Sequence, residues 1–289
     1  MFEKILIATD LSPASDCLLQ CAGELKAIGV RQIVLGHVIY VANTPGLEDA
    51  LKNEASPVLA RQKQTLEEAG FEVIVEMPLG RPARELKELA NRYDVDAILL
   101  GSRGHGIAQR AVLGSIAFKL LHITDKPVLL QRVTLLGEGE ACRLSLCSRM
   151  FEHVLFLTDF SEAAEHAFGQ FEKIAPGLSG SVTLLHIQDD APFKDPYTGK
   201  WAKELEGMNQ QWLDRLKERL GKKGVNVEAE LAIGNLREVV LEKAAEGTYS
   251  LIAMGTQGKG FFSEIVLGSL AHEVACRAEI PVFFYPNPH

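Results

Sequence analysis

The sequence has few cysteines and no long apolar run. Its 289 residues include five cysteines, an odd number without zinc-type pairing, which argues against a disulfide framework. Cys17 and Cys21 fall on one face of a predicted helix, where small apolar packing is favoured over a redox or metal role. No run approaches the roughly 20 apolar residues that a membrane-spanning helix needs. These absences argue against a disulfide-rich fold and a membrane-spanning chain.

An excess of positive charge is also absent. The formal net charge is −8, from 38 acidic and 30 basic residues, which disfavours a surface built to neutralise nucleic-acid phosphates. The opening Met1-Phe2-Glu3-Lys4 leads straight into an apolar run, so no signal peptide is expected. The sequence predicts a cytoplasmic protein with neither nucleic acid nor membrane as a partner.

What the chain does contain is a duplication of domain size. Corresponding residues lie 149 positions apart in the early part of each copy and 154 apart from Gly80 and Gly234 onward. Such spacing indicates two domains and not a short solenoid period. We expect domains over residues 1–133 and 150–289, joined by a linker over 134–149.

Short apolar runs alternate with helical patterns in both copies, which predicts α/β domains. Runs such as Ile5-Leu6-Ile7-Ala8 are continuously apolar, as in parallel strands covered on both faces. Ser12 and Ser161 are expected to cap the first helix of each copy. The prediction is two tandem, doubly wound open parallel sheets, Rossmann-like, with five strands each in the order 3-2-1-4-5. The predicted strands are 4–9, 32–40, 71–77, 97–100 and 127–133, then 153–158, 181–188, 225–232, 251–254 and 281–285.

A glycine-rich segment follows the fourth predicted strand of each copy. It reads Gly101-Ser102-Arg103-Gly104, nine residues, then Gly114-Ser115, and recurs as Gly255-Thr256-Gln257-Gly258, nine residues, then Gly268-Ser269. A loop of this kind before a helix presents backbone N–H groups to a phosphate. It is not a P-loop, because no lysine follows the last glycine, and the first strand–helix turn lacks the dinucleotide fingerprint. Asp10 and Asp159, each ending a first strand, fall where open α/β sheets bind ligands.

This pattern resembles the universal stress protein family. The resemblance rests on the Gly-x2-Gly-x9-Gly-Ser spacing, the Asp that closes the first strand and the Pro-Val of the last one. The two copies resemble the tandem members of the nucleotide-binding branch. The resemblance implies a stress-response regulator that binds an adenine nucleotide, ATP, ADP or AMP, in each half. Mg²⁺ would arrive with the phosphates and not through a protein cage.

The resemblance also implies a role for each matching residue. Asp10 and Asp159 would contact the ribose, and Val38 and Ile187, ending the second strands, would line the adenine pocket. Gln257 replaces Arg103, which puts a side-chain phosphate contact in the second copy in doubt. The residues implied beneath the base and sugar are Leu100, Gly101, Met254 and Gly255; those implied around the phosphates are Arg103, Gly104, Gly114, Ser115 and Ile116, then Gln257, Gly258, Gly268, Ser269 and Leu270.

Three classes of function compete at this point. A nucleotide-binding regulatory protein is the leading one, ahead of a slow ATP hydrolase or phosphotransferase and of a nucleotide-free interaction scaffold. No catalytic residue or protein metal ligand is predicted, because neither copy offers the charged set that phosphoryl transfer needs. Without a ligand, the glycines would be turn glycines and the two aspartates helix-start acids.

Other side chains have simpler expected roles. His37 and His186 are expected to be hydrogen-bonded core histidines, and Trp201 and Trp212 to anchor an amphipathic helix on the sheet. The last strands, 127–133 and 281–285, lie at a sheet edge in the predicted order, where unpaired backbone groups invite pairing. We therefore expect the halves to dock there as an internal pseudo-dimer. The whole chain would remain free to form homo-oligomers. The resemblance implies the same pairing.

Overall fold

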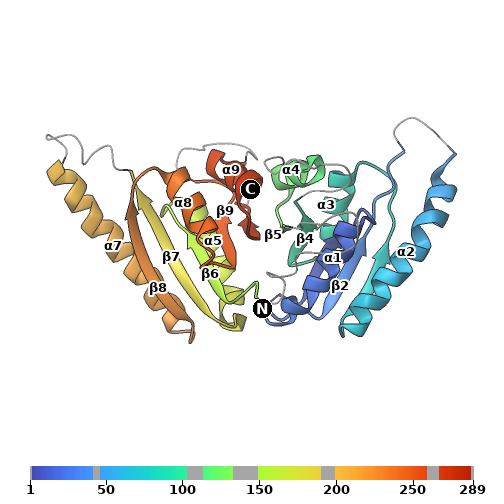
Figure 1. The fold of residues 1–289 in the computed structure, drawn as a ribbon, viewed down its shortest axis with the longest axis horizontal. Helices are drawn as coiled ribbons and strands as arrows, with labels where there is room; N and C mark the ends of the chain where they lie inside the picture. Colours follow the sequence, from blue (N-terminus) through green and yellow to red (C-terminus); the bar gives the residue numbers. More distant parts are fainter. Residues whose placement is uncertain are drawn as a thin grey trace. The chain divides into compact units, whose positions relative to one another are not determined.

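The computed structural model describes residues 2–41, 46–102, 113–132, 149–189, 199–258 and 267–287. The chain divides into two compact units, Met1–Arg149 and Met150–Asn287, called here the first and second halves. Each is a sheet with helices packed against it (Figure 1). Residues 134–148 of the predicted linker lie outside the described residues.

The first half holds a parallel sheet with strand order β3-β2-β1-β4-β5. Helix α1 packs against α2, and α3 packs against α4, so the helices form two layers around the sheet. The elements are β1 (Lys4–Ala8), α1 (Pro13–Gln20), a 3-10 helix η1 (Cys21–Lys26), β2 (Gln32–Gly36), α2 (Glu48–Glu68), β3 (Glu72–Glu76), α3 (Pro82–Arg92), β4 (Ala97–Gly101), α4 (Ser115–Ile123) and β5 (Val128–Gln131).

The second half repeats this arrangement with the order β8-β7-β6-β9-β10, again parallel. Counted within each half, both orders read 3-2-1-4-5, so the predicted fold is confirmed. The elements are β6 (His153–Leu157), α5 (Glu162–Ile174), a 3-10 helix η3 (Ala175–Gly177), β7 (Ser181–Gln188), α7 (Gly199–Gly221), β8 (Asn226–Ile233), α8 (Leu236–Ala245), β9 (Leu251–Gly255), α9 (Ser269–Arg277) and β10 (Val282–Tyr285).

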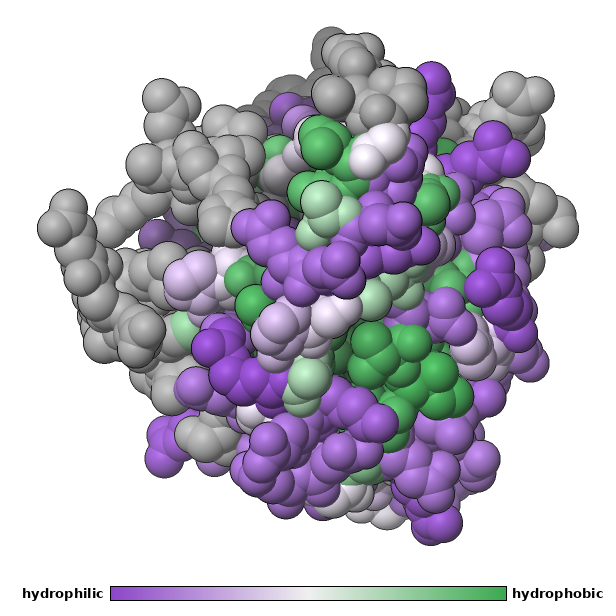
Figure 2. Space-filling view, turned by 90° about the vertical axis from the view of Figure 1, so that its right-hand side faces the viewer, coloured by the Kyte–Doolittle hydropathy of each residue, from purple (hydrophilic) through white to green (hydrophobic). Residues whose placement is uncertain are grey.

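The core of each half lies on both faces of its central strands. Ile5, Leu6 and Ile7 of β1 are all buried, as expected for a strand that helices cover on both sides. In the second half, Phe156 of β6 packs edge-on against Phe168 of α5. The side of the first half that bears α2 is mostly hydrophilic, broken by smaller apolar areas (Figure 2). Among the described helices, none is long and apolar enough to cross a bilayer.

Both predicted helix caps are confirmed. The Ser12 side chain accepts a hydrogen bond from the Ser15 N–H, and Pro13 takes the first helical position of α1. The Ser161 side chain accepts from the Ala164 N–H at the start of α5. Each cap satisfies a backbone donor that the helix itself leaves unpaired.

The second strand of the first half is shorter than predicted, ending at Gly36 and not at Tyr40. The His37 N–H still donates to the Glu76 carbonyl of β3, but the next neighbour on that strand is Pro78. Proline has no N–H to donate, so the regular ladder is interrupted there, and the pairing resumes at the single bridge between Ile39 and Leu79. In the second half Ala232 holds the matching position, and β7 and β8 pair without a break from Ser181 to Gln188.

The predicted role of the two tryptophans is wrong. Trp201 is 56% exposed and Trp212 is 46% exposed, so neither is buried between α7 and the sheet. Leu213, Leu216 and Leu220 form the buried face of α7 instead. Trp212 lies beside this face, under the Arg215 guanidinium. Tryptophan and leucine both suit the apolar face of an amphipathic helix. The rotation of α7 about its axis decides that the leucines face the sheet.

Candidate functional site

Each half has one hollow at the carboxyl ends of its central strands. The first cavity measures about 350 Å³ and the second about 410 Å³. In both, the ends of the first and fourth strands of the half contribute to the lining, together with the start of the helix that follows the glycine-rich segment. Ligands of open α/β sheets bind at this end of the strands.

The structure brings most of the sequence-predicted residues together around these cavities. In the first half these are Asp10, Val38, Leu100, Gly101, Gly114, Ser115 and Ile116. Arg103 and Gly104 lie outside the described residues. Val38 follows β2 by two residues, because the strand is shorter than predicted. In the second half they are Asp159, Ile187, Met254, Gly255, Gln257, Gly258, Gly268, Ser269 and Leu270.

A left-handed residue follows each strand-end aspartate. Leu11 has φ 63° and Phe160 has φ 59°, values that non-glycine residues rarely adopt. The turn brings the carboxylate back over the start of the next helix, and the Asp10 Oδ1 accepts from the Ser12 N–H at 3.1 Å. The corresponding distance from the Ser161 N–H to the Asp159 Oδ1 is 3.0 Å. Backbone strain of this kind is typical of positions that a functional site fixes in place.

The two aspartates differ in one of the hydroxyl groups near them. The Asp10 Oδ1 also accepts from the Ser12 hydroxyl at 2.5 Å and from the Ser15 hydroxyl at 2.6 Å. The Asp159 Oδ1 accepts from the Ser161 hydroxyl at 2.5 Å, but Ala164 stands where the first half has Ser15. The hydroxyl of Ser15 thus fixes the first carboxylate and has no counterpart at the matching position of the second half. The sequence pattern did not single out Ser15.

The helices α4 and α9 begin without a side-chain cap. Gly114 and Gly268 occupy the cap positions, where no side chain is present to accept from the first N–H groups. The first helical residues, such as Ser115 and Ser269, line the two cavities. Uncapped N–H groups and the positive end of the helix dipole make such a start a binding place for an anion.

Two glycines of the second loop have a steric reason to be glycine. A Cβ on Gly258 would lie 2.6 Å from the Asp159 Oδ2, and one on Gly268 would lie 3.1 Å from the Thr256 carbonyl oxygen. The loop thus passes so close to the strand-end carboxylate that a side chain at 258 would displace either the loop or the Asp159 side chain. The glycine spacing brings the loop and Asp159 together at one edge of the cavity.

His37 and His186 both line their cavities and both bond to the neighbouring strand. The Nδ1 of His37 lies 3.0 Å from the Thr9 carbonyl oxygen, and the Nδ1 of His186 lies 2.8 Å from that of Thr158. A carbonyl only accepts, so Nδ1 carries the proton in both rings. Their predicted role as hydrogen-bonded histidines is confirmed. The ring of Phe160 lies against that of His186 with 4.4 Å between centroids.

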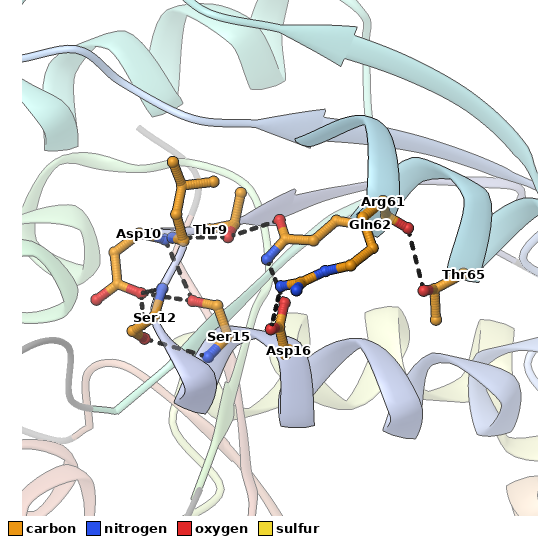
Figure 3. A network of polar contacts seen from close by, with 9 residues as sticks. Thr9, Asp10, Ser12, Ser15, Asp16, Arg61, Gln62 and Thr65 are labelled. Atoms are coloured by element: carbon orange, nitrogen blue, oxygen red, sulfur yellow. Dashed lines mark hydrogen bonds and ion pairs between the residues drawn. The ribbon is translucent and has the colours of Figure 1, made fainter. Parts of the chain in front are cut away.

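In the first half, a polar network links the strand-end turn to α2 (Figure 3). The Thr9 hydroxyl donates to the Gln62 Oε1 at 3.0 Å, and the Gln62 Nε2 donates to the Asp16 Oδ1 at 2.7 Å. Arg61 completes it with an ion pair to the other oxygen of Asp16. Gln62 is only 1% exposed, so both ends of its amide depend on these partners. No sequence pattern marked Gln62.

The comparisons with known proteins agree with this geometry. The model of the Universal stress protein family matches residues 1–132 and 150–286. The chain belongs to the universal stress protein family. A universal stress protein of Mycolicibacterium smegmatis is 28% identical over 294 residues, covering 96% of this chain and 95% of its own.

A single-domain relative and a solved structure show the same kinship. Universal stress protein MJ0577 of Methanocaldococcus jannaschii is 29% identical over 152 residues, which cover 45% of this chain and 94% of that protein. The crystal structure of a universal stress protein from Archaeoglobus fulgidus superposes with a TM-score of 0.77 at 26% identity, covering 99% of this chain and 98% of that one. The tandem organisation is therefore found in other members.

We predict that Gln62→Leu destabilises the first half by about 1–3 kcal/mol, because the buried Thr9 hydroxyl and Asp16 lose partners. The free energy of unfolding in urea measures this loss. Leu216 holds the matching position on α7, so leucine suits the shape of this helix face. Arg61→Ala is the control, since it removes only the exposed ion pair and should cost under about 1 kcal/mol. Equal losses in the two variants would contradict the structural role of Gln62.

Proposed function

We propose that each half binds one adenine nucleotide, and that the protein is a cytoplasmic stress-response regulator whose conformation or partners respond to nucleotide. The observation that carries the proposal is the pairing of an uncapped helix start with a strand-end aspartate in one cavity. The helix start suits the phosphates, and the carboxylate of Asp10 or Asp159 suits the ribose hydroxyls as an acceptor. The membership of the universal stress protein family supports the same reading.

The arrangement gives a nucleotide one orientation in each cavity. The phosphates lie at Gly114 and Ser115 or at Gly268 and Ser269, and the base lies toward Val38 or Ile187 beyond the second strand of the half. Mg²⁺ comes with the phosphates. Among the described residues no group of three or more His, Cys, Asp or Glu side chains is arranged to hold a metal ion.

We predict that Gly114→Val abolishes binding in the first half and Gly268→Val in the second, each leaving the other site intact. A valine side chain occupies the phosphate space and strains the loop, since even a Cβ at 268 is crowded. Calorimetric titration with ATP, ADP and AMP measures the stoichiometry, which should fall from two to one in each variant. The same titrations show whether the first site is the tighter one, as Arg103 in place of Gln257 suggests.

The control for the valine variants is Gly169→Ala. Gly169 lies within α5 with open space where a Cβ would stand, so alanine there should leave both sites unchanged. Wild-type protein that binds no adenine nucleotide would overturn the proposal, and the nucleotide-free scaffold would then replace it.

We predict that ATP hydrolysis, where it occurs, is at least a hundredfold below a typical turnover of about 10 per second. The reason is the missing P-loop lysine and the lack, in the sequence of either copy, of the compact Lys/Arg/Asp set that phosphoryl transfer needs. A steady-state phosphate-release assay with Mg²⁺ measures the rate. Turnover near that of ordinary kinases, lost in Asp10→Ala or Asp159→Ala, would contradict this prediction and favour the enzyme.

We also propose that the halves dock through β5 and β10, the last strands of the two sheet orders. Glutamate at Leu129 and at Phe283 should then separate the halves, because a buried charge there opposes the pairing. Small-angle X-ray scattering should show a larger radius of gyration, with circular dichroism showing that both halves stay folded. An unchanged radius in folded variants would mean that the halves pair elsewhere or not at all.

A further inference from the structure

The two cavities differ in the wall that lies beyond the second strand of each half. Gln188, at the end of β7, and Asn209, on α7, both line the second cavity. Gln188 lies on β7, where the offset is 149, and the positive-φ glycines that follow α2 and α7, Gly70 and Gly224, are already 154 apart. The matching residues of the first half are therefore Ile39 and Ala55. Both of these are buried and apolar. The second half has thus placed an amide pair where the first half has none.

Both amides are buried, yet the hydrogen-bonding capacity of Asn209 is only partly used. Gln188 is 5% exposed and Asn209 is 7% exposed. The Nδ2 of Asn209 donates to the Oε1 of Gln188 at 3.2 Å, the single hydrogen bond that the described structure gives Asn209. An asparagine amide has two N–H donors and one carbonyl acceptor. One N–H and the carbonyl of Asn209 therefore remain for a ligand in the cavity.

The first half shows what a purely structural amide looks like in this fold. One buried amide there is Gln62, whose oxygen accepts from Thr9 and whose nitrogen donates to Asp16. The matching position on α7 is Leu216, whose side chain cannot form the hydrogen bonds that Gln62 makes. The buried amide of α7 stands instead on the cavity wall, seven residues earlier on the helix. Asn209 differs from Gln62 in two ways: it lines the cavity, and one N–H and its carbonyl have no hydrogen-bond partner in the described structure.

The sheet order places this wall at the base end of the proposed nucleotide. β7 and β9 flank β6 on opposite sides, so their ends lie two strand spacings apart, about 10 Å. The glycine-rich segment leaves β9 on one side, and the amide pair stands at the end of β7 on the other. A nucleotide with its phosphates at Gly268 therefore presents its base toward Asn209.

We infer that Asn209 reads the edge of a purine base in the second site, an inference that rests on the proposed function. A side-chain amide pairs with adenine in a bidentate fashion, its carbonyl accepting from the exocyclic amine and its N–H donating to the adjacent ring nitrogen. This pair uses the N6 and N7 edge of adenine. At that edge hypoxanthine presents two acceptors, its 6-carbonyl and N7, so an amide cannot make both hydrogen bonds in either orientation. The second site thus selects the 6-amino purine through Asn209, whereas Ile39 and Ala55 give the first site no such reader.

The test uses full-length protein that keeps only the second site, Gly114→Val, with and without Asn209→Ala. ATP and inosine triphosphate are titrated calorimetrically into each. We expect the second site to bind ATP at least tenfold more tightly than inosine triphosphate, because a site built to hydrogen-bond a group rejects the analogue that lacks it. Asn209→Ala should weaken ATP binding about tenfold and leave binding of inosine triphosphate nearly unchanged.

The matched control is Gly268→Val, which keeps only the first site. Adding Asn209→Ala to it should change neither the affinity for ATP nor that for inosine triphosphate. Asn209 lines only the second cavity, and the matching residue of the first half is Ala55. Equal affinity of the second site for the two triphosphates in the Gly114→Val protein overturns the inference, even if the Asn209 variant fails to fold. An ATP affinity that Asn209→Ala leaves unchanged overturns it as well. Both results leave the proposed function standing, whereas wild-type protein that binds no nucleotide overturns both.

Discussion

The turn that closes the first strand of each half is the constraint on which each candidate site depends. A non-glycine residue in the left-handed region costs about 1–2 kcal/mol, and both Leu11 and Phe160 adopt it. In return the preceding aspartate folds back over the helix start and bonds the serine that caps the helix. One short segment thereby sets the end of the strand, the start of the helix and the direction of a carboxylate.

The second strand–helix junction of each site uses the opposite device. At Gly114 and Gly268 the cap side chain is missing, so the helix start keeps its N–H groups for another partner. The same sheet edge therefore holds a capped helix that supplies a fixed anion and an uncapped helix that attracts one. The carboxylate and the uncapped helix start follow neighbouring strands of the sheet. Together they suit a ligand that carries hydroxyl groups at one point and phosphates at another.

The duplicated halves build their two sites from the same elements but with different side chains. The first half ties its site to α2 through Gln62 and holds Asp10 with the additional hydroxyl of Ser15. The second half has leucine and alanine at those positions, and an amide pair on its cavity wall. On α2 the polar residue is Gln62 and the apolar one is Ala55, whereas on α7 the matching positions are the apolar Leu216 and the polar Asn209. The two halves are therefore not expected to behave as copies of one site.

The sequence by itself determined the duplication, the presence of the strands in each half, the serine caps and the glycine spacing. These depend on local patterns: apolar runs set strands, a serine before a helix satisfies a neighbouring N–H, and glycines allow close approach. Tertiary structure alone decided where β2 ends, because Pro78 on the neighbouring strand interrupts the ladder before its single further bridge at Ile39. It also decided that Gln62 links the strand-end turn to α2 and that Asn209 lines a cavity, since their partners, Thr9 and Gln188, lie 53 and 21 residues away. A lone amide carries no sequence pattern, and only folding shows which groups it meets.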